Sequence, residues 1–287
     1  MGLSKYIDAG ETLVIITPDG IKQNRSLQTR LATTVHEVIK AYRLVLMDLR
    51  AQSFGLYLGH LWFLLEPALQ AGAYYFLLSV VFRMQGADAT FAFFFIGITF
   101  WRSHSTLVTS APYFLVSKGY SYIEQGLGLL PALLETLISE VVLLMARLVV
   151  LAGFLLAIGT PAQATWLLLP LVLIVQFLFS MALFMLLSML GAKYKDVGRL
   201  VGHAVWLWWY LSPGLYSLGR IPDWALLIYR ANPFAYLMPS YHEMILKGTW
   251  SQTNILGCFI IAVLSIAVLI YANRLMYRFS YRLVHHV

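Results

Sequence analysis

Apolar runs long enough to cross a bilayer recur along the chain, separated by short polar or proline-containing intervals. A membrane-spanning helix needs about 20 consecutive apolar residues, and a bilayer admits only helices or closed barrels. The pattern therefore predicts an all-α polytopic membrane protein. Its six predicted transmembrane helices lie at 58–82, 90–110, 127–158, 164–190, 200–218 and 254–272.

The chain before the first apolar run has two parts. Residues 1–30 are polar, and we expect a cytosolic segment in which Thr12–Thr17 forms a short strand or belongs to a partly ordered tail. Residues 31–57 carry apolar side chains at helical spacing with basic residues elsewhere, which predicts an amphipathic helix at the membrane interface, ending in an elbow. An ordinary cytosolic helix packed on a partner is the alternative.

The interval between the fifth and sixth runs is unusual. Residues 219–250 are too apolar for a free loop and are broken by Pro222, Pro233 and Pro239, so they are unsuited to a full span. We expect two short re-entrant helices with a bend at Asn232-Pro233. Residues 276–287 are expected to form a cytosolic tail.

Composition and charge agree with a membrane protein. Only 11% of the residues are charged and 60% are hydrophobic, whereas a soluble domain has about 25% charged residues. With both termini inside, fourteen Lys and Arg residues lie on the cytoplasmic side and four on the other. This asymmetry predicts cytoplasmic termini. The net charge of +7 indicates contact with anionic lipid rather than nucleic acid. The polar N-terminus indicates no cleavable signal peptide.

The sequence contains no motif for catalysis, metal binding or a phosphate-binding loop. Its histidines are scattered and Cys258 is its single cysteine, so we expect no metal site and no enzyme activity. Charges within the apolar runs form either a polar pathway or structural ion pairs. They are Glu66, Arg102, Glu135, Glu140 and Arg147.

Aromatic residues cluster in the middle of predicted spans rather than at the interfaces where Trp and Tyr usually gather. Helix packing and a channel whose flat faces stack on sugar rings explain them equally well. With Arg102, the candidate channel residues are Tyr74, Tyr75, Trp206, Trp208, Trp209, Tyr210 and Tyr216.

The elbow places Gly55, Gly59, Trp62 and Glu66-Pro67 in an FG…LGxLWxxLEP pattern. Further characteristic segments are Ala132–Ile138, Tyr194–Val197, Leu211–Pro213 with Tyr216, Ile221-Pro222 and Asn232-Pro233. Together these stretches resemble the ABC-2 type permeases that export bacterial capsule, O-antigen and related polysaccharides, and the elbow carries the strongest similarity. The sequence departs from the family pattern in two places. The segment LVSKGYSYIEQ lacks a proline-basic element, and Gly214 stands where the family has a branched residue.

The resemblance implies a half-transporter in the bacterial inner membrane. Two copies would pair, two separate ATP-binding subunits would hold ATP and Mg²⁺, and no cofactor would bind this chain. The substrate would be a lipid-linked polysaccharide passed on to periplasmic or outer-membrane components, and membrane lipids would surround the spans. The elbow residues Gly55, Gly59, Trp62 and Glu66 would form a gate. Residues for ATPase coupling would be Lys118, Tyr120, Tyr122 and Glu124.

The sequence leaves other functions open. An ABC-2 permease for a drug or small amphiphile would share the fold. An integral-membrane glycosyl- or acyltransferase would need a catalytic cluster that the sequence lacks. A secondary transporter is disfavoured because the chain shows no internal repeat.

Overall fold

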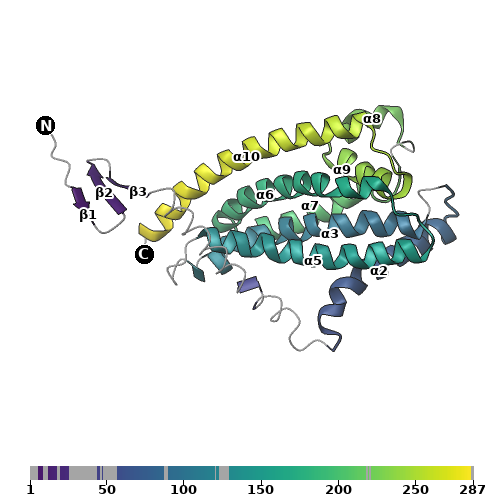
Figure 1. Cartoon of the computed structure of the whole chain (residues 1–287), viewed down its shortest axis with the longest axis horizontal. Coiled ribbons are helices and arrows are strands. Elements are labelled where there is room, and N and C mark those ends of the chain that lie inside the picture. Colours follow the sequence, from purple (N-terminus) through teal and green to yellow (C-terminus); the bar gives the residue numbers. More distant parts are fainter. Residues whose placement is uncertain are drawn as a thin grey trace.

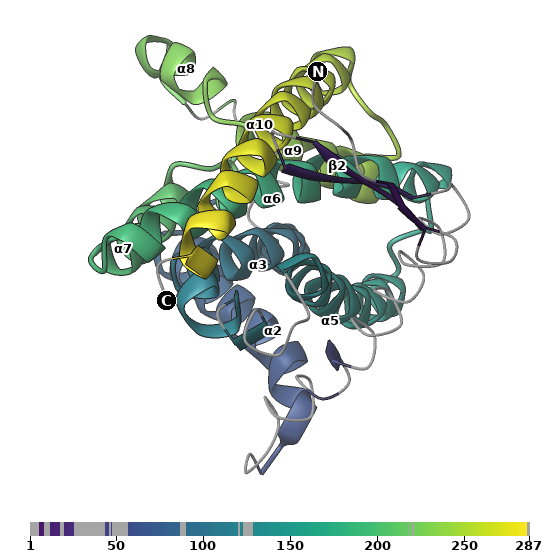
Figure 2. The ribbon, with the colours of Figure 1, turned by 90° about the vertical axis from the view of Figure 1, so that its left-hand side faces the viewer.

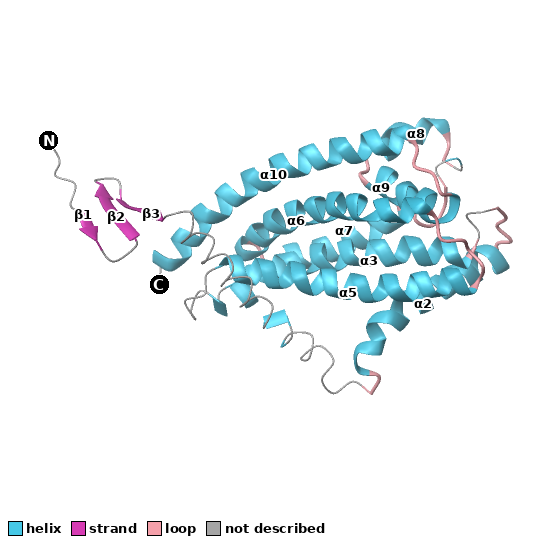
Figure 3. Cartoon of the chain, viewed as in Figure 1, coloured by secondary structure: helices cyan, strands magenta, loops and turns pink. Residues whose placement is uncertain are grey.

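The computed structural model describes residues 6–8, 12–17, 20–25, 44–45, 47, 57–86, 90–119, 121–122, 129–217, 219 and 221–285. From residue 57 onward the described chain is helical, and the strands form one small sheet near the N-terminus (Figure 3). The predicted interfacial helix at 31–57, including Gly55, lies almost wholly outside the described residues.

The N-terminal sheet has three antiparallel strands in the order β1-β2-β3: β1 (Tyr6–Asp8), β2 (Thr12–Thr17) and β3 (Gly20–Arg25). The strand expected at Thr12–Thr17 is therefore present as β2. It pairs along its whole length with β3, with Thr17 opposite Gly20, which makes a hairpin with a short turn. The sheet lies beyond the end of the helical bundle at which α10 finishes (Figure 1).

The bundle is built around one helix, α3 (Phe91–Phe114), which packs against α2, α5, α6, α7 and α9. Seen end-on, α3 lies between these neighbours (Figure 2). Every residue from Ala92 to Trp101 is buried. The remaining elements are η1 (Gly59–Leu61), α2 (Trp62–Tyr74), η2 (Tyr75–Val81), η4 (Leu115–Gly119), α5 (Leu129–Ala157), η5 (Ala164–Leu168), α6 (Leu169–Lys193), α7 (Val197–Tyr210), α8 (Asp223–Arg230), α9 (Phe234–His242), η7 (Glu243–Lys247) and α10 (Gln252–His285).

Small residues allow the closest approaches to α3. A Cβ atom on Gly191 of α6 would lie 2.2 Å from the carbonyl oxygen of Pro112. A Cβ atom on Gly97 would lie 2.8 Å from the carbonyl oxygen of Gly214, in the turn after α7. Helix backbones in a membrane pack closely where such small residues meet. These two contacts therefore set the distances of α6 and of the turn after α7 from the central helix.

Four described helices are long and apolar enough to cross a membrane: Trp62–Val81, Leu129–Ala157, Ala164–Lys193 and Gln252–Met276. These four coincide with the predicted first, third, fourth and sixth spans. The predicted second span is α3, which does not reach the same hydropathy. Because its neighbours cover it, α3 needs less apolar surface than a helix that faces lipid.

The fifth predicted span, 200–218, is wrong in extent. α7 begins earlier and ends at Tyr210, and the chain turns at Ser212-Pro213-Gly214. Proline lacks the N–H and clashes with the preceding turn of a helix, which explains the stop. Fourteen residues make a helix about 21 Å long, shorter than the hydrocarbon core of about 30 Å.

Two segments expected to be polar connections are helical instead. α3 and η4 together continue past residue 110, the predicted end of the second span, as far as Gly119. The hydroxyls of Thr109, Ser110 and Ser117 donate to carbonyl oxygens one turn back at 2.7, 3.0 and 2.7 Å, so these polar side chains are satisfied within the helix. Likewise, α10 continues through most of the expected tail to His285.

The segment between α7 and α10 contains the two expected short helices, α8 and α9. They are separated by a bend that includes Asn232, whose side-chain oxygen accepts a hydrogen bond from the Phe234 N–H at 3.0 Å and begins α9. η7 then ends at Gly248, whose φ of +67° is a left-handed conformation that suits glycine.

Candidate functional site

A cavity of about 200 Å³ lies between α2, α3 and α7, near the middle of the bundle. Each helix contributes side chains at helical spacing, so one face of each lines the same space. Four predicted channel residues meet here: Tyr74, Arg102, Trp206 and Trp209. The other lining residues are Gln70, Ile98, Trp101, Ser105, Thr109, Gly202 and Val205.

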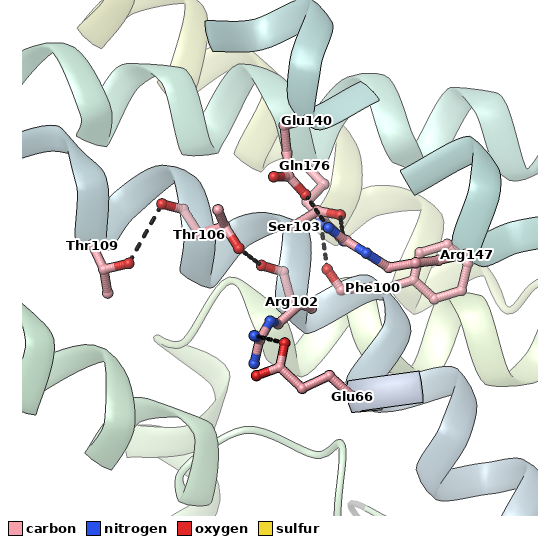
Figure 4. A network of polar contacts seen from close by, with 9 residues as sticks. All are labelled: Glu66, Phe100, Arg102, Ser103, Thr106, Thr109, Glu140, Arg147 and Gln176. Carbon is pink, nitrogen blue, oxygen red and sulfur yellow. Dashed lines mark hydrogen bonds and ion pairs between the residues drawn. The ribbon is translucent and has the colours of Figure 1, made fainter. Parts of the chain in front are cut away.

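Arg102 is held across the cavity edge by an ion pair. Its guanidinium donates to the carboxylate of Glu66 on α2 (Figure 4). The side chains are 36% and 53% exposed, respectively. The main-chain carbonyl of Arg102 accepts a hydrogen bond from the Thr106 hydroxyl at 2.9 Å (Figure 4). The expected gate residue Glu66 and the expected channel residue Arg102 are thus direct partners.

The aromatic residues of the cavity form a connected wall. The indole N–H of Trp209 donates to the hydroxyl of Tyr74 at 3.1 Å, and the rings of Trp209 and Trp101 lie 5.3 Å apart. The Tyr74 hydroxyl in turn donates to that of Tyr210 at 3.5 Å. Trp206 packs edge-on against Tyr210 at 5.1 Å, and both of these rings stay exposed. The wall therefore presents flat faces and hydroxyl or indole edges together.

Three predicted channel residues lie elsewhere. Trp208 points away from the cavity and donates its indole N–H to the Asn232 side-chain oxygen at 2.9 Å. Tyr75 packs against Phe91, with ring centres 6.3 Å apart. The Tyr216 hydroxyl donates to the Tyr210 carbonyl oxygen at 2.6 Å. Trp208 and Trp209 point in different directions because successive side chains on a helix are rotated by about 100°.

A stripe of hydroxyl-bearing side chains on α3 was missed in the sequence reading. Thr106, Ser110, Tyr113 and Ser117 recur every third or fourth position after Arg102 and are exposed in the chain. They line, with hydroxyls of α5, a second cavity of about 240 Å³ between the two helices. The spacing was the available signal, because residues three or four apart share one helix face. We refer to Arg102, Ser105, Thr106, Thr109, Ser110, Tyr113 and Ser117 as the polar face of α3.

Ion pairs account for all five charges within the predicted spans. Besides Glu66 and Arg102, Glu140 lies 3.0 Å from Arg147, and both side chains are buried. Arg147 also donates to the Ser103 hydroxyl at 3.0 Å (Figure 4). Glu135, 1% exposed, accepts from Lys118 at 2.9 Å. Of the two predictions for these charges, a polar pathway or structural ion pairs, the structural ion pairs are therefore correct for Glu135, Glu140 and Arg147.

The predicted coupling residues are only partly described. Lys118 lies in the last turn of η4 and pairs with Glu135, and Tyr122 is half-buried against the buried cluster that includes Ala111 and Phe114. Tyr120 and Glu124 lie outside the described residues, as does the gate residue Gly55.

The described gate residues lie where α2 begins. Gly59 opens η1 with a φ of +51°, a conformation that suits glycine, and a Cβ atom there would meet no atom within 4 Å. Trp62, the first residue of α2, is exposed. Conformation rather than lack of space therefore requires the glycine.

Polar groups in the core are arranged for packing rather than metal binding. Among the described residues no group of three or more His, Cys, Asp and Glu could hold a metal ion. His104 is fully buried beside Trp208 and Phe234, and its Nδ1 lies 2.8 Å from the Ser180 hydroxyl. Cys258 is buried and free.

A helical bundle with four candidate membrane spans and an exposed polar face on its central helix has the architecture of a multi-pass membrane protein. Residues 46–246 match the family described as ABC-2 type transporter, and the chain belongs to this family. Two relatives from Klebsiella pneumoniae, each named O-antigen export system permease protein RfbA, are 26% identical over 235 residues, covering 81% of this chain and 90% of theirs. The Myxococcus xanthus protein of the same name is 32% identical over 213 residues, covering 70% of this chain and 78% of its own.

Family membership carries three plain consequences. The chain is a multi-pass membrane protein and a transport subunit, not an enzyme. It works with an ATP-binding partner, which hydrolyses the ATP.

Proposed function

We propose that this chain is the permease subunit of an ATP-driven exporter that moves a lipid-linked cell-surface polysaccharide out of the cytosol. Two copies would pair in the bacterial inner membrane, each with both termini in the cytoplasm and six spans, which include α3 and, although it is shorter than the hydrocarbon core, α7. Two ATP-binding subunits would dock below, holding ATP and Mg²⁺. Periplasmic or outer-membrane components would receive the glycan. The names of the relatives in Klebsiella and Myxococcus support the substrate class.

The observation that carries the proposal is the uncovered polar face of α3 beside the aromatic wall. Thr106, Ser110 and Ser117 are exposed although they belong to the helix that its neighbours otherwise bury. Polar groups in a bilayer face a bundle interior or a water-filled path rather than lipid. Pairing of two copies across this side would enclose such a path.

The chemistry of the surface suits a sugar chain. Trp206 and Tyr210 offer exposed aromatic faces, on which the C–H faces of sugar rings stack. The hydroxyls of Ser105 and Thr109 and the amide of Gln70 can exchange hydrogen bonds with sugar hydroxyls. Such contacts are individually weak, which suits a surface along which a long polymer moves.

The test compares surface polysaccharide in cells that lack this chain, in cells complemented with it, and in cells carrying Trp206→Ala or Tyr210→Ala. We expect no surface glycan without the chain and severalfold less with either variant. Tyr271→Ala is the matched control, because Tyr271 is an exposed tyrosine on α10, a helix that contributes no residue to the cavity, whereas Trp206 and Tyr210 lie on α7, which lines it. Normal surface glycan without the chain would refute the proposal, and loss of drug resistance instead would assign a small amphiphile as substrate.

A further inference from the structure

Arg102 is the one charged side chain among the residues that line the cavity between α2, α3 and α7. Its counter-ion, Glu66, is not among these residues and reaches it from one turn below on α2. The other lining residues include neutral groups that can form hydrogen bonds, from Gln70, Tyr74 and Ser105. The cavity would therefore carry one positive charge if Glu66 moved aside.

The pair between Arg102 and Glu66 differs from the other ion pairs among described residues. Glu140 and Arg147 are 3% and 5% exposed, and Glu135 is 1% exposed, so these carboxylates are enclosed by protein. The Arg102 and Glu66 side chains are 36% and 53% exposed. Exposed pairs contribute little because water competes for both charges. This pair is therefore the one that an entering anion can exchange.

Arginine is suited to such an exchange. Its planar guanidinium binds carboxylate and phosphate through two parallel hydrogen bonds and keeps its charge at any physiological pH. In Figure 4 the Glu66 carboxylate lies against one side of the Arg102 guanidinium. An incoming phosphate or carboxylate would compete for the same N–H groups.

We propose that Arg102 binds an anionic group of the transported molecule, a phosphate or a carboxylate, and that Glu66 is the resident carboxylate that this group replaces. This inference rests on the proposed export function and specifies its substrate as anionic. Release of Glu66 breaks the ion pair that joins α2 to α3 close to the start of α2. Once substrate has bound, this ion pair no longer holds α2, the helix that follows the elbow, to α3.

The experiment uses the permease together with its ATP-binding partner in proteoliposomes, with ATPase stimulation as the readout. Farnesyl phosphate is compared with farnesol, and a tetrasaccharide containing glucuronate with a neutral tetrasaccharide. Response to only one of the two anions identifies the source, lipid phosphate or glycan carboxylate. Both anions failing to exceed their neutral counterparts would overturn the proposal.

Four variants separate anion binding from a structural ion pair. Glu66→Gln removes the competitor, and the half-saturating concentration of the active anion should fall by about two- to fivefold. Arg102→Gln should raise it at least about tenfold, and Arg102→Lys should raise it less because a cation remains. The exchange Glu66→Arg with Arg102→Glu rebuilds the pair in reverse, and it should still abolish the response to anions.

The outcomes also separate this inference from the export function. Arg274→Gln, which removes an exposed arginine on α10, is the matched control for charge loss and should respond like the unmodified chain. If surface glycan depends on the chain but the reversed pair exports normally, export stands and the anion site is refuted. If anions stimulate the unmodified chain and not the reversed pair, the anion site stands even where loss of the whole chain leaves surface glycan unaffected.

Discussion

The buried ion pair between Glu140 and Arg147 allows a quantitative test of the bundle core. Both side chains are at least 95% buried, with 3.0 Å between Glu140 Oε1 and Arg147 Nη2, and Ser103 is the further hydrogen-bond partner of Arg147. Glu140→Leu leaves the guanidinium with one neutral partner, and a guanidinium cannot release its proton. We expect this change to destabilise the protein by about 3–5 kcal/mol.

The reverse truncation should cost less. Arg147→Met leaves the Glu140 carboxylate, which can bind a proton and which borders the cavity of about 240 Å³ between α3 and α5. We expect a loss of about 1–3 kcal/mol, the usual cost of an unsatisfied buried polar group. The double variant leaves no charge behind and should lie within about 1 kcal/mol of the unmodified protein.

Thermal unfolding in detergent, followed by tryptophan fluorescence, measures these differences. With a shift of about 2–4 °C per kcal/mol, Glu140→Leu should lower Tm by about 6–20 °C, and addition of Arg147→Met should restore most of the loss. The reasoning would be refuted if the double variant lost the sum of the two single losses, because the two charges would then be independent.

Three further predictions concern packing and coupling. Gly191→Ala should destabilise the protein by about 1–3 kcal/mol or prevent assembly, since its Cβ would lie 2.2 Å from a backbone oxygen of α3. As the control in the same Tm assay, Gly153→Ala meets no atom within 4 Å and should be neutral or slightly stabilising. Lys118→Glu places two carboxylates together and should reduce stimulation of the partner ATPase, and adding Glu135→Lys should restore the stimulation. A double variant that assembles yet stays inactive would instead assign Lys118 a direct contact with the partner. Trp208→Phe should lower stability by about 1–2 kcal/mol through its lost hydrogen bond without altering substrate response, and a changed response at unchanged Tm would contradict its place outside the cavity.

Several features of the fold followed from local sequence. Apolar runs and their breaks predicted four of the helices that can span a membrane, because hydropathy and run length depend only on neighbouring residues. Asn232-Pro233 predicted the bend between two short helices for the same reason. Pro213 also carried the signal that α7 ends early, although the apolar run around it concealed that stop.

The candidate site was predicted only in part. Tyr74, Arg102, Trp206 and Trp209 do line one cavity, whereas Trp208 is not among its lining residues and packs toward Asn232 and Phe234 instead. Composition identified the aromatic cluster, but the direction of each ring depends on which neighbouring helix lies beside it. The polar face of α3 could have been found from spacing alone.

Sequence by itself determined that this protein is a helical membrane bundle with charges and aromatic rings inside its apolar runs, since transfer into lipid depends on local composition. Only the tertiary structure decided which charges pair. Glu66 and Arg102 are 36 positions apart and meet because α2 packs on α3. Tertiary structure also decided that this pair stays half exposed at a cavity while Glu140 and Arg147 are enclosed. Exposure depends on every neighbouring helix, and it separates an exchangeable ion pair from a structural one.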